Sequence, residues 1–288
     1  MNGFLLVDKA SGMTSHDVVA KMRKRFETKR VGHAGTLDPM ATGVLVLGIG
    51  SATRLLQYVT DGSKSYDATI RLGQSTHTDD FEGDVLTTND AQNLTDLEIT
   101  DALKQFVGTI MQRPSSVSAI KIAGKTAHQR VRDGEEFEIP AREVTITRIE
   151  VKSISRVAQF VDIEVSVDAS VGTYIRAIAR DLGEALKVGG HLTTLRRTLV
   201  SPFSLAECKT LELAEPISVA EGISRILEVR TLDNNEQIEI SFGRTISASK
   251  SAGPIAALDS SGEFVALLLN KTEAGKEIAT PILVSVKE

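Results

Sequence analysis

The sequence predicts an α/β fold of the α+β kind, in which a mixed, largely antiparallel central sheet is followed by a small C-terminal β domain. Strand-like and helix-like segments are interspersed along most of the chain without the regular alternation that builds a parallel sheet. After Val229, residues 232–236 favour a polar linker, which leads into short strand-like pieces separated by glycines. We therefore expect one large domain over residues 1–229 and a small β domain over residues 232–288.

The individual elements follow from the spacing of apolar residues. Thr14 and Asp17 form a capping-box pattern after the apolar residues 5–7, which predicts an amphipathic helix ending near Phe26. Residues 43–50 favour a buried strand, and the alternation from Tyr66 to Leu72 favours a half-buried one. Helical spacing recurs at residues 95–107, 126–133 and 173–186, strand-like segments recur at 144–151, 160–167 and 192–200, and an acidic, turn-rich loop spans 76–90.

The composition is that of an ordinary globular protein. Hydrophobic residues make up 41% and charged residues 25% of the chain. The apolar runs are much shorter than the roughly 20 residues that span a bilayer, and no signal-like segment opens the sequence. We expect a cytoplasmic protein without membrane contact. The single cysteine, Cys208, cannot form an internal disulfide, and no cysteine or histidine spacing indicates a metal site.

The charges are distributed unevenly along the chain. Residues 1–60 carry 8 basic and 4 acidic side chains, whereas residues 61–110 carry 3 and 10, and residues 231–288 carry 5 and 8. The first segment contains a basic cluster formed by Lys21, Arg23, Lys24, Arg25, Lys29 and Arg30. A solvated helix face is one interpretation of this cluster, but its density favours contact with phosphates.

The most informative segment surrounds Asp38. Pro39 favours extended backbone at Asp38, and glycines at 35 and 43 permit tight turns on both sides. An isolated Asp-Pro is more simply explained as an Asx-turn. The whole segment, however, reads His33-Ala34-Gly35-Thr36-Leu37-Asp38-Pro39-Met40-Ala41-Thr42-Gly43. It resembles the catalytic motif of the TruB-type tRNA pseudouridine synthases.

The resemblance extends over roughly residues 4–203. Four other motifs of this family occur in the family's order. The first is matched by residues 6–9 and 12–15, the second by 64–66 and 72–73, the third by 172–176 and 180–183, and the fourth by 191–198. Because the matched segments are ordered and distant from one another, the similarity is far more specific than the Asp-Pro turn alone.

The resemblance implies a pseudouridine synthase fold and an isomerase that needs neither cofactor nor metal. Such an enzyme would convert the T-loop uridine, position 55, of elongator tRNAs into pseudouridine, binding the T-stem-loop as a monomer. Asp38 would be the catalytic carboxylate, either as a nucleophile at C1′ or as a base that yields a glycal. Arg176 would pair with Asp38 and keep it ionised. Tyr66 would stack on the base and help remove its C5 proton.

Four further residues would bind the substrate by the same resemblance. Leu195 would pack against the target base, although a strand leucine is more often core. His33 would help to evert the nucleotide from its loop. Lys9 and Lys64 would contact phosphates.

Some features depart from the family pattern. Residues 112–140 match an RNA-gripping insertion, but Ser115 and Ser116 replace a proline and a tyrosine that are common there. The acidic C-terminal domain stands where relatives often carry a PUA domain, an RNA-binding β-barrel, so we expect a PUA-like fold.

Two alternatives to this enzyme remain. A tRNA-binding folding factor would have little or no catalytic role, and folding assistance could also accompany catalysis. A hydrolase with an aspartyl intermediate would need a water-activating partner, and the sequence near Asp38 offers none.

Overall fold

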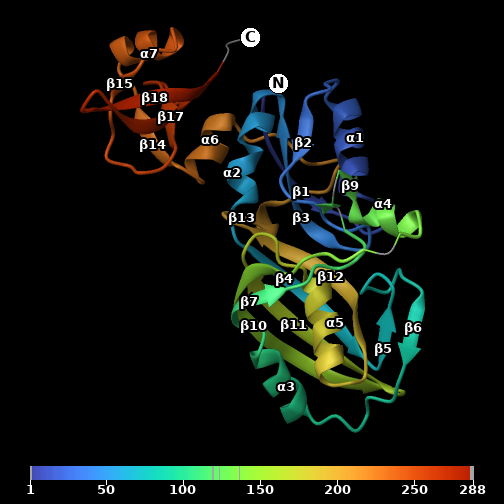
Figure 1. The fold of residues 1–288 in the computed structure, drawn as a ribbon. Helices are drawn as coiled ribbons and strands as arrows, with labels where there is room; N and C mark the ends of the chain where they lie inside the picture. Colours follow the sequence, from blue (N-terminus) through green and yellow to red (C-terminus); the bar gives the residue numbers. More distant parts are fainter. Residues whose placement is uncertain (1, 119, 123, 136, 286–288) are drawn as a thin grey trace.

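The computed structural model describes residues 2–118, 120–122, 124–135 and 137–285 (Figure 1). Within them, a nine-stranded sheet forms the centre of the larger part of the molecule, with β2 (Val31–His33) and β13 (Phe203–Ser204) paired to its main path. That path runs β1 (Gly3–Lys9), β3 (Thr42–Ile49), β12 (Gly190–Val200), β4 (Lys64–Leu72), β11 (Phe160–Ala169), β10 (Arg142–Val157) and β7 (Gly108–Gln112). Among these described strands β3 and β12 pair in parallel and the other pairs are antiparallel, which confirms the predicted mixed sheet.

The burial of each strand explains its sequence pattern. Strands β1 and β3 are buried on both faces, so their apolar residues run almost without interruption. Strand β4 buries Tyr66, Ala68, Ile70 and Leu72 on one face only, so polar residues alternate with them.

Helices cover the sheet on both faces. Helices α1 (Ser15–Arg25), α3 (Asp96–Lys104) and α5 (Ile175–Ala185) contribute to one apolar cluster, and Figure 1 shows α3 and α5 beside β10 and β11. A second cluster contains residues of a 3₁₀ turn (Gly50–Leu55), α2 (Leu56–Thr60) and α6 (Val219–Ser224). The three helices expected over 14–26, 95–107 and 173–186 are thereby confirmed.

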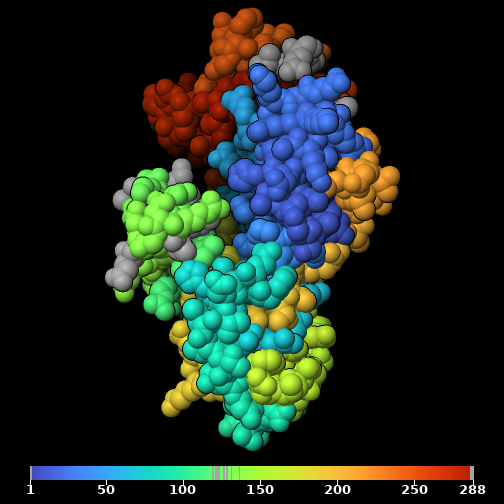
Figure 2. All heavy atoms as spheres, turned by 90° about the vertical axis from the view of Figure 1, so that its right-hand side faces the viewer, coloured from blue at the N-terminus to red at the C-terminus, as the bar shows by residue number. Residues whose placement is uncertain are grey.

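Two segments that do not belong to the central sheet lie beside it. The acidic loop lies within a hairpin of β5 (Gln74–Thr76) and β6 (Val85–Thr88). The insertion contains β8 (Lys121–Ile122), β9 (Lys125–Thr126) and α4 (Ala127–Arg132), while residues 119, 123 and 136 of the predicted 112–140 segment lie outside the described residues. Figure 2 shows the insertion, in green, standing out beside the N-terminal segment and above the hairpin.

The C-terminal part forms a separate five-stranded sheet in the described residues. Its order is β14 (Glu228–Thr231), β16 (Ile255–Leu258), β17 (Phe264–Glu273), β18 (Lys276–Val284) and β15 (Ile246–Ser247). The prediction of a polar linker at 232–236 is wrong, because Asp233 caps helix α7 (Asn234–Ser241) and forms a capping box with Glu236. The first strand of the second sheet, β14, begins at Glu228, slightly before the expected boundary.

The two sheets share an apolar contact. Phe264, Leu267 and Leu283 of the second sheet belong to the same buried cluster as Phe4 and Ile223, and a short 3₁₀ turn (Leu205–Glu207) precedes this junction. The C-terminal sheet is thus packed against the larger part of the molecule. No described helix has the length and apolar character needed to cross a membrane.

Candidate active site

The loop that carries Asp38 lies between β2 and β3 and is closed by a tight approach at Gly43. Gly43 has a φ of +100°, and a Cβ there would lie 2.2 Å from the carbonyl oxygen of Arg197. Gly35 also has a positive φ, +88°. The backbone amide of Ala41 donates to the carbonyl of Asp38 at 3.1 Å. Both glycines are therefore needed for the turn that presents Asp38.

Two buried side chains, Lys9 at the end of β1 and Ser15 at the start of α1, hold this loop. The Ser15 hydroxyl donates to the Leu37 carbonyl at 3.1 Å and accepts from the Leu37 amide at 2.9 Å. Lys9 Nζ donates to three carbonyl oxygens, those of Ala10 (3.0 Å), Met13 (2.7 Å) and Pro39 (3.1 Å).

The placement of Lys9 differs from the expected phosphate contact. Its side chain is fully buried, and burial lowers the pKa of Lys9 to about 8. An ammonium group that is buried and already donates to three carbonyls cannot reach a backbone phosphate without leaving the core. We therefore assign Lys9 to the support of the Asp38 loop.

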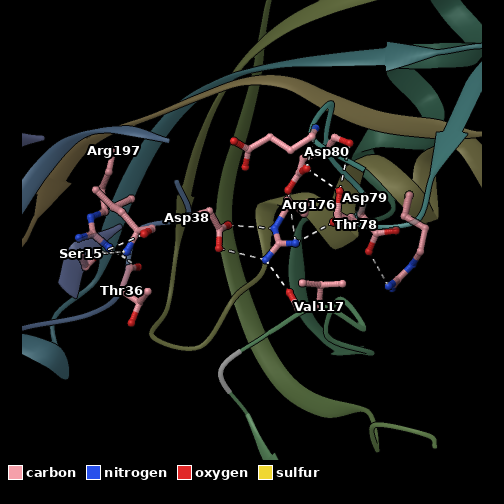
Figure 3. A network of polar contacts seen from close by, with 12 residues as sticks. Ser15, Thr36, Asp38, Thr78, Asp79, Asp80, Val117, Arg176 and Arg197 are labelled. Atoms are coloured by element: carbon pink, nitrogen blue, oxygen red, sulfur yellow. Dashed lines mark hydrogen bonds and ion pairs between the residues drawn. The ribbon is translucent and has the colours of Figure 1, made fainter. Parts of the chain in front are cut away.

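Arg197 holds the same loop from the sheet. Its guanidinium donates to the carbonyl oxygens of Val44 (2.8 Å), Gly35 (3.1 Å) and Thr36 (3.3 Å), and the residue is 1% exposed. Burial lowers the pKa of Arg197, although Tyr66 and Asp38 oppose this effect. Arg197 is near Asp38 without touching its carboxylate (Figure 3).

Arg176, in the first turn of α5, grips the Asp38 carboxylate with two nitrogens. Nε lies 2.9 Å from Oδ2, and Nη2 donates to Oδ1 at 3.1 Å (Figure 3). The Arg176 side chain is only 5% exposed, while that of Asp38 is 32% exposed. The ion pair and the hydrogen bond together set the orientation of the carboxylate. Asp38 is thus an oriented carboxylate that solvent or substrate can still reach.

A second carboxylate orients Arg176 from the opposite side. Asp80 Oδ2 lies 3.4 Å from Arg176 Nη1, which also donates to the Thr78 carbonyl at 2.7 Å. Asp80 is buried and accepts from the Thr78 hydroxyl (2.5 Å) and the Glu82 amide (3.1 Å). The buried guanidinium therefore has partners on several sides, as a buried charge requires.

The Asp38–Arg176 pair borders a cavity of about 260 Å³. Tyr66 from β4 and Leu195 from β12 line it, together with Tyr174 at the start of α5. An aromatic ring, an apolar side chain and an oriented carboxylate thus meet around one space, which suits a flat, partly apolar ring held beside a reacting carbon.

Lys64 also lines this cavity, but its amine already donates to two backbone carbonyls. Nζ donates to the carbonyls of Thr60 (2.7 Å) and Gly62 (2.6 Å), at the C-terminal end of α2. Burial, with a further contribution from Arg197, lowers the pKa of Lys64 to about 8. A phosphate contact would require Lys64 to exchange these carbonyls for the phosphate.

His33 lies at the end of β2 and does not line the described cavity. Its ring meets that of His16 edge-on, with centroids 5.5 Å apart and an interplanar angle of 86°. Burial lowers the pKa of His33, and His16 and Arg197 lower it further. The structure therefore brings Asp38, Arg176, Tyr66, Leu195 and Lys64 together around one cavity, whereas His33 and Lys9 do not line it. The roles expected for these residues stay predictions.

Asp80 and Arg197 had no role predicted from the sequence. Asp80 was one acidic residue in a turn-rich loop, and Arg197 lay within a matched segment without a function of its own. Their burial was the informative property, because a charged residue is rarely buried without a partner. Burial depends on the assembled fold, although the hydroxyl-rich Thr76-His77-Thr78 before the aspartates indicates local caps.

The described residues contain no group of three or more His, Cys, Asp or Glu side chains placed to hold a metal ion. The single cysteine, Cys208, is half-buried, and burial raises its pKa to about 12.

Comparisons with known proteins agree on one family. A model described as TruB family pseudouridylate synthase (N terminal domain) matches residues 23–175, and one described as tRNA pseudouridylate synthase B C-terminal domain matches residues 176–221. Two curated proteins named tRNA pseudouridine synthase B are each 51% identical to this chain. The match to the protein of Corynebacterium diphtheriae covers 97% of this chain and 95% of that protein. The match to the protein of Paenarthrobacter aurescens covers 96% of this chain and 94% of that protein.

Solved structures share the fold. The structure titled "Crystal Structure of a Cbf5-Nop10-Gar1 Complex" has a TM-score of 0.69 at 25% identity, covering 99% of this chain and 84% of that one. "Structure of H/ACA RNP bound to a substrate RNA containing 2'-deoxyuridine" has the same TM-score and coverage at 24% identity. The similarity thus includes the C-terminal sheet.

Proposed function

Because the chain belongs to the TruB family of pseudouridylate synthases, we propose that it converts the T-loop uridine, position 55, of elongator tRNAs into pseudouridine. The protein is an isomerase of the tRNA pseudouridine synthase B type. The observation that carries the finer proposal is the Asp38 carboxylate, gripped by Arg176 at the edge of a cavity that Tyr66 and Leu195 line.

The chemistry needs one carboxylate beside the ribose. The N1–C1′ bond of uridine breaks, the uracil rotates in place, a C5–C1′ bond forms, and the C5 proton leaves. Asp38 acts either by attack on C1′, giving a transient ester, or by removal of a ribose proton, giving a glycal. Both routes are redox-neutral and retain every heavy atom of the base, so the reaction is complete without a cofactor.

The neighbours of Asp38 support this assignment. Arg176 stabilises the carboxylate as an anion, which either route requires. Tyr66 and Leu195 offer an aromatic and an apolar wall between which a uracil ring can be held while it rotates.

Contacts with the rest of the RNA extend this proposal. His33 precedes by two residues Gly35, which lines the cavity, and its ring would fill the space vacated by an everted nucleotide. Lys64 would change partners on binding, and the insertion at 112–140 would grip the T-stem-loop. We propose that the C-terminal sheet is PUA-like, because it stands where the family resemblance implies such a domain.

The test uses unmodified tRNA transcript that carries 5-tritiated uridine. Asp38→Asn keeps the size of the side chain and removes its charge, so tritium release should fall by on the order of 10³-fold or more. The dissociation constant for tRNA should change by less than about 3-fold, because the Asp38 carboxylate is needed for the reaction more than for binding.

Asp162→Asn is the matched control. Asp162 also accepts two guanidinium contacts, from Arg71 at 2.7 Å each, but does not line the cavity. This variant should release tritium at the wild-type rate. Equal release from Asp38→Asn and the wild type would overturn the role of Asp38, and release from neither would favour the alternative of a tRNA-binding folding factor.

A further inference from the structure

Helix α5 carries a second arginine one turn after Arg176. Arg180 faces Asp79, with Nη1 3.2 Å from Oδ2, just as Arg176 faces the adjacent Asp80. Residues four apart on a helix lie on the same face. The two arginines therefore meet two consecutive aspartates of the β5–β6 hairpin, and Figure 3 shows Asp79 and Asp80 beside Arg176.

Both arginines also hold the start of the insertion, the segment 112–118, which we call the first limb. Arg176 Nη2 donates to the Val117 carbonyl at 3.0 Å, and Arg180 Nη2 donates to the Arg113 carbonyl at 2.7 Å. At the base of the limb, the buried Gln112 side chain accepts from the Tyr174 amide (2.8 Å) and donates to its carbonyl (3.0 Å). The limb is thus attached at three points to α5 and the residue before it.

This arrangement joins the limb to Asp38. The same Arg176 nitrogen, Nη2, donates to Asp38 Oδ1 at 3.1 Å and to the Val117 carbonyl at 3.0 Å. A displacement of the limb removes one of the partners that fix the guanidinium plane. Because Arg176 orients Asp38, its tilt would move the carboxylate relative to the ribose.

We propose that Arg180 is a second positioning arginine: oriented by Asp79, it holds the first limb in place through the Arg113 carbonyl, so that Val117 and Arg176 keep Asp38 aligned. This inference rests on the proposed function, because it assigns Arg180 a part in the same reaction. Arg180 does not line the cavity and acts only through the limb.

A purely structural role for Arg180 predicts something different. Asp79 is 7% exposed, and burial raises its pKa even with Arg180 beside it. Removal of Arg180 leaves this buried carboxylate without its cation, which destabilises the fold whatever the limb does. Arg180 also contacts Asp181, at 2.7 Å. The test must therefore separate stability from alignment.

The experiment compares Arg180→Met, the double variant Asp79→Asn/Arg180→Met, and Arg71→Met as the matched control. Arg71 pairs with Asp162, with Nη2 2.7 Å from Oδ2, and the limb takes no part in this pair. For each protein we would measure Tm, the dissociation constant for tRNA, the single-turnover rate of tritium release, and amide hydrogen exchange over residues 112–118.

Arg180→Met should lower both Tm and the single-turnover rate, the rate by about 10-fold to 100-fold, as expected for a misplaced reacting group. Exchange in the first limb should increase. Arg71→Met should lower Tm while leaving the rate and the limb exchange as in the wild type. The double variant should recover part of the Tm, because position 79 then carries a neutral amide in place of a buried charge. It should not recover the rate, because nothing donates to the Arg113 carbonyl.

The inference is overturned if limb exchange in Arg180→Met matches that of Arg71→Met, or if the rate recovers together with Tm in the double variant. The exchange result does not depend on activity. A wild-type protein that releases no tritium would instead contradict the proposed function, so the two failures are distinguishable.

Discussion

At the scale of single residues, the site consists of a carboxylate and a guanidinium that differ in how many partners they have and in how far they are exposed. Arg176 has two aspartates and two carbonyls as partners, so its burial is compensated. Asp38 shares this guanidinium yet keeps about a third of its side chain exposed. This asymmetry makes Asp38, and not the buried Asp80, the carboxylate that a substrate can meet.

His33 offers a pH-dependent test at this scale. Its folded pKa lies below the ordinary value of 6.5, chiefly through burial. As the pH falls below 6.5, position 33 therefore binds a proton in the unfolded chain before it does so in the folded protein. The free energy of unfolding decreases over this range, until the pH has passed the folded pKa. A ¹H NMR titration of the His33 ring should give a midpoint below 6.5.

Protonation of His33 can also be followed through its effect on the stability of the protein. The His33→Phe variant has no titratable group at position 33, so its urea midpoint should fall less than that of the wild type between pH 7.5 and pH 5.5. Parallel pH profiles for the two proteins would contradict a lowered pKa at His33.

At the scale of elements, the loop between β2 and β3 depends on its fit against β12. Gly43 and Arg197 are partners in the parallel register of β3 and β12, and their backbones approach too closely for any side chain at position 43. The position of Asp38 is thereby set by the sheet as well as by Ser15 and Lys9.

Gly43→Ala should disrupt this element. The positive φ alone costs about 1–3 kcal/mol, and the Cβ would meet the Arg197 carbonyl oxygen at 2.2 Å, so the loop must shift. We expect a lower Tm together with a loss of tritium release of about 100-fold.

Gly108→Ala separates the two causes. Gly108 has a comparable φ of +110°, but a Cβ there would meet nothing within 4 Å. This control should lose stability from strain only and keep its activity. Similar losses of activity in both variants would show that close packing at Gly43 is unimportant.

The helices and strands of the structure also show which local sequence patterns predict secondary structure correctly. The apolar spacing located β3, β4, α1 and α5, because burial on one or both faces leaves a direct mark on the sequence. The polar residues 232–236 were wrongly interpreted as a linker, because acidic residues favour a helix start as much as a loop. A capping box was already visible in Asp233 and Glu236.

At the scale of the whole molecule, charge is unevenly distributed along the chain. The N-terminal segment is basic, whereas residues 61–110 and the C-terminal sheet are acidic. Within the basic cluster, Arg25 is committed to Glu215 and to the carbonyls of Leu211 and Ala214, and Arg23 donates to the Val31 carbonyl. Exposed residues of α1 such as Lys21 and Lys24 are the better candidates for phosphate contact.

Lys21→Glu/Lys24→Glu should therefore weaken tRNA binding. If each lysine binds one phosphate, the slope of log K against log salt should become shallower by about 0.7 to 0.9 for each lysine replaced. Filter binding over a series of KCl concentrations measures this slope. Lys276→Glu, an exposed lysine of the C-terminal sheet, is the control and should change affinity less. An unchanged slope in the double variant would rule out this helix as a phosphate-binding surface.

The sequence by itself determined the order of the motifs, the mixed sheet and the choice of Asp38 as the candidate carboxylate, because local periodicity and a specific run of residues record these directly. Only the tertiary structure decided which charges are buried together. Arg176 and Asp38 are 138 residues apart, and Arg180 is 101 residues from Asp79. Lys9 looked like a surface cation until the fold enclosed it. The physical reason is that the pairing of a charge depends on its distance and burial, which arise only when remote segments are packed against one another.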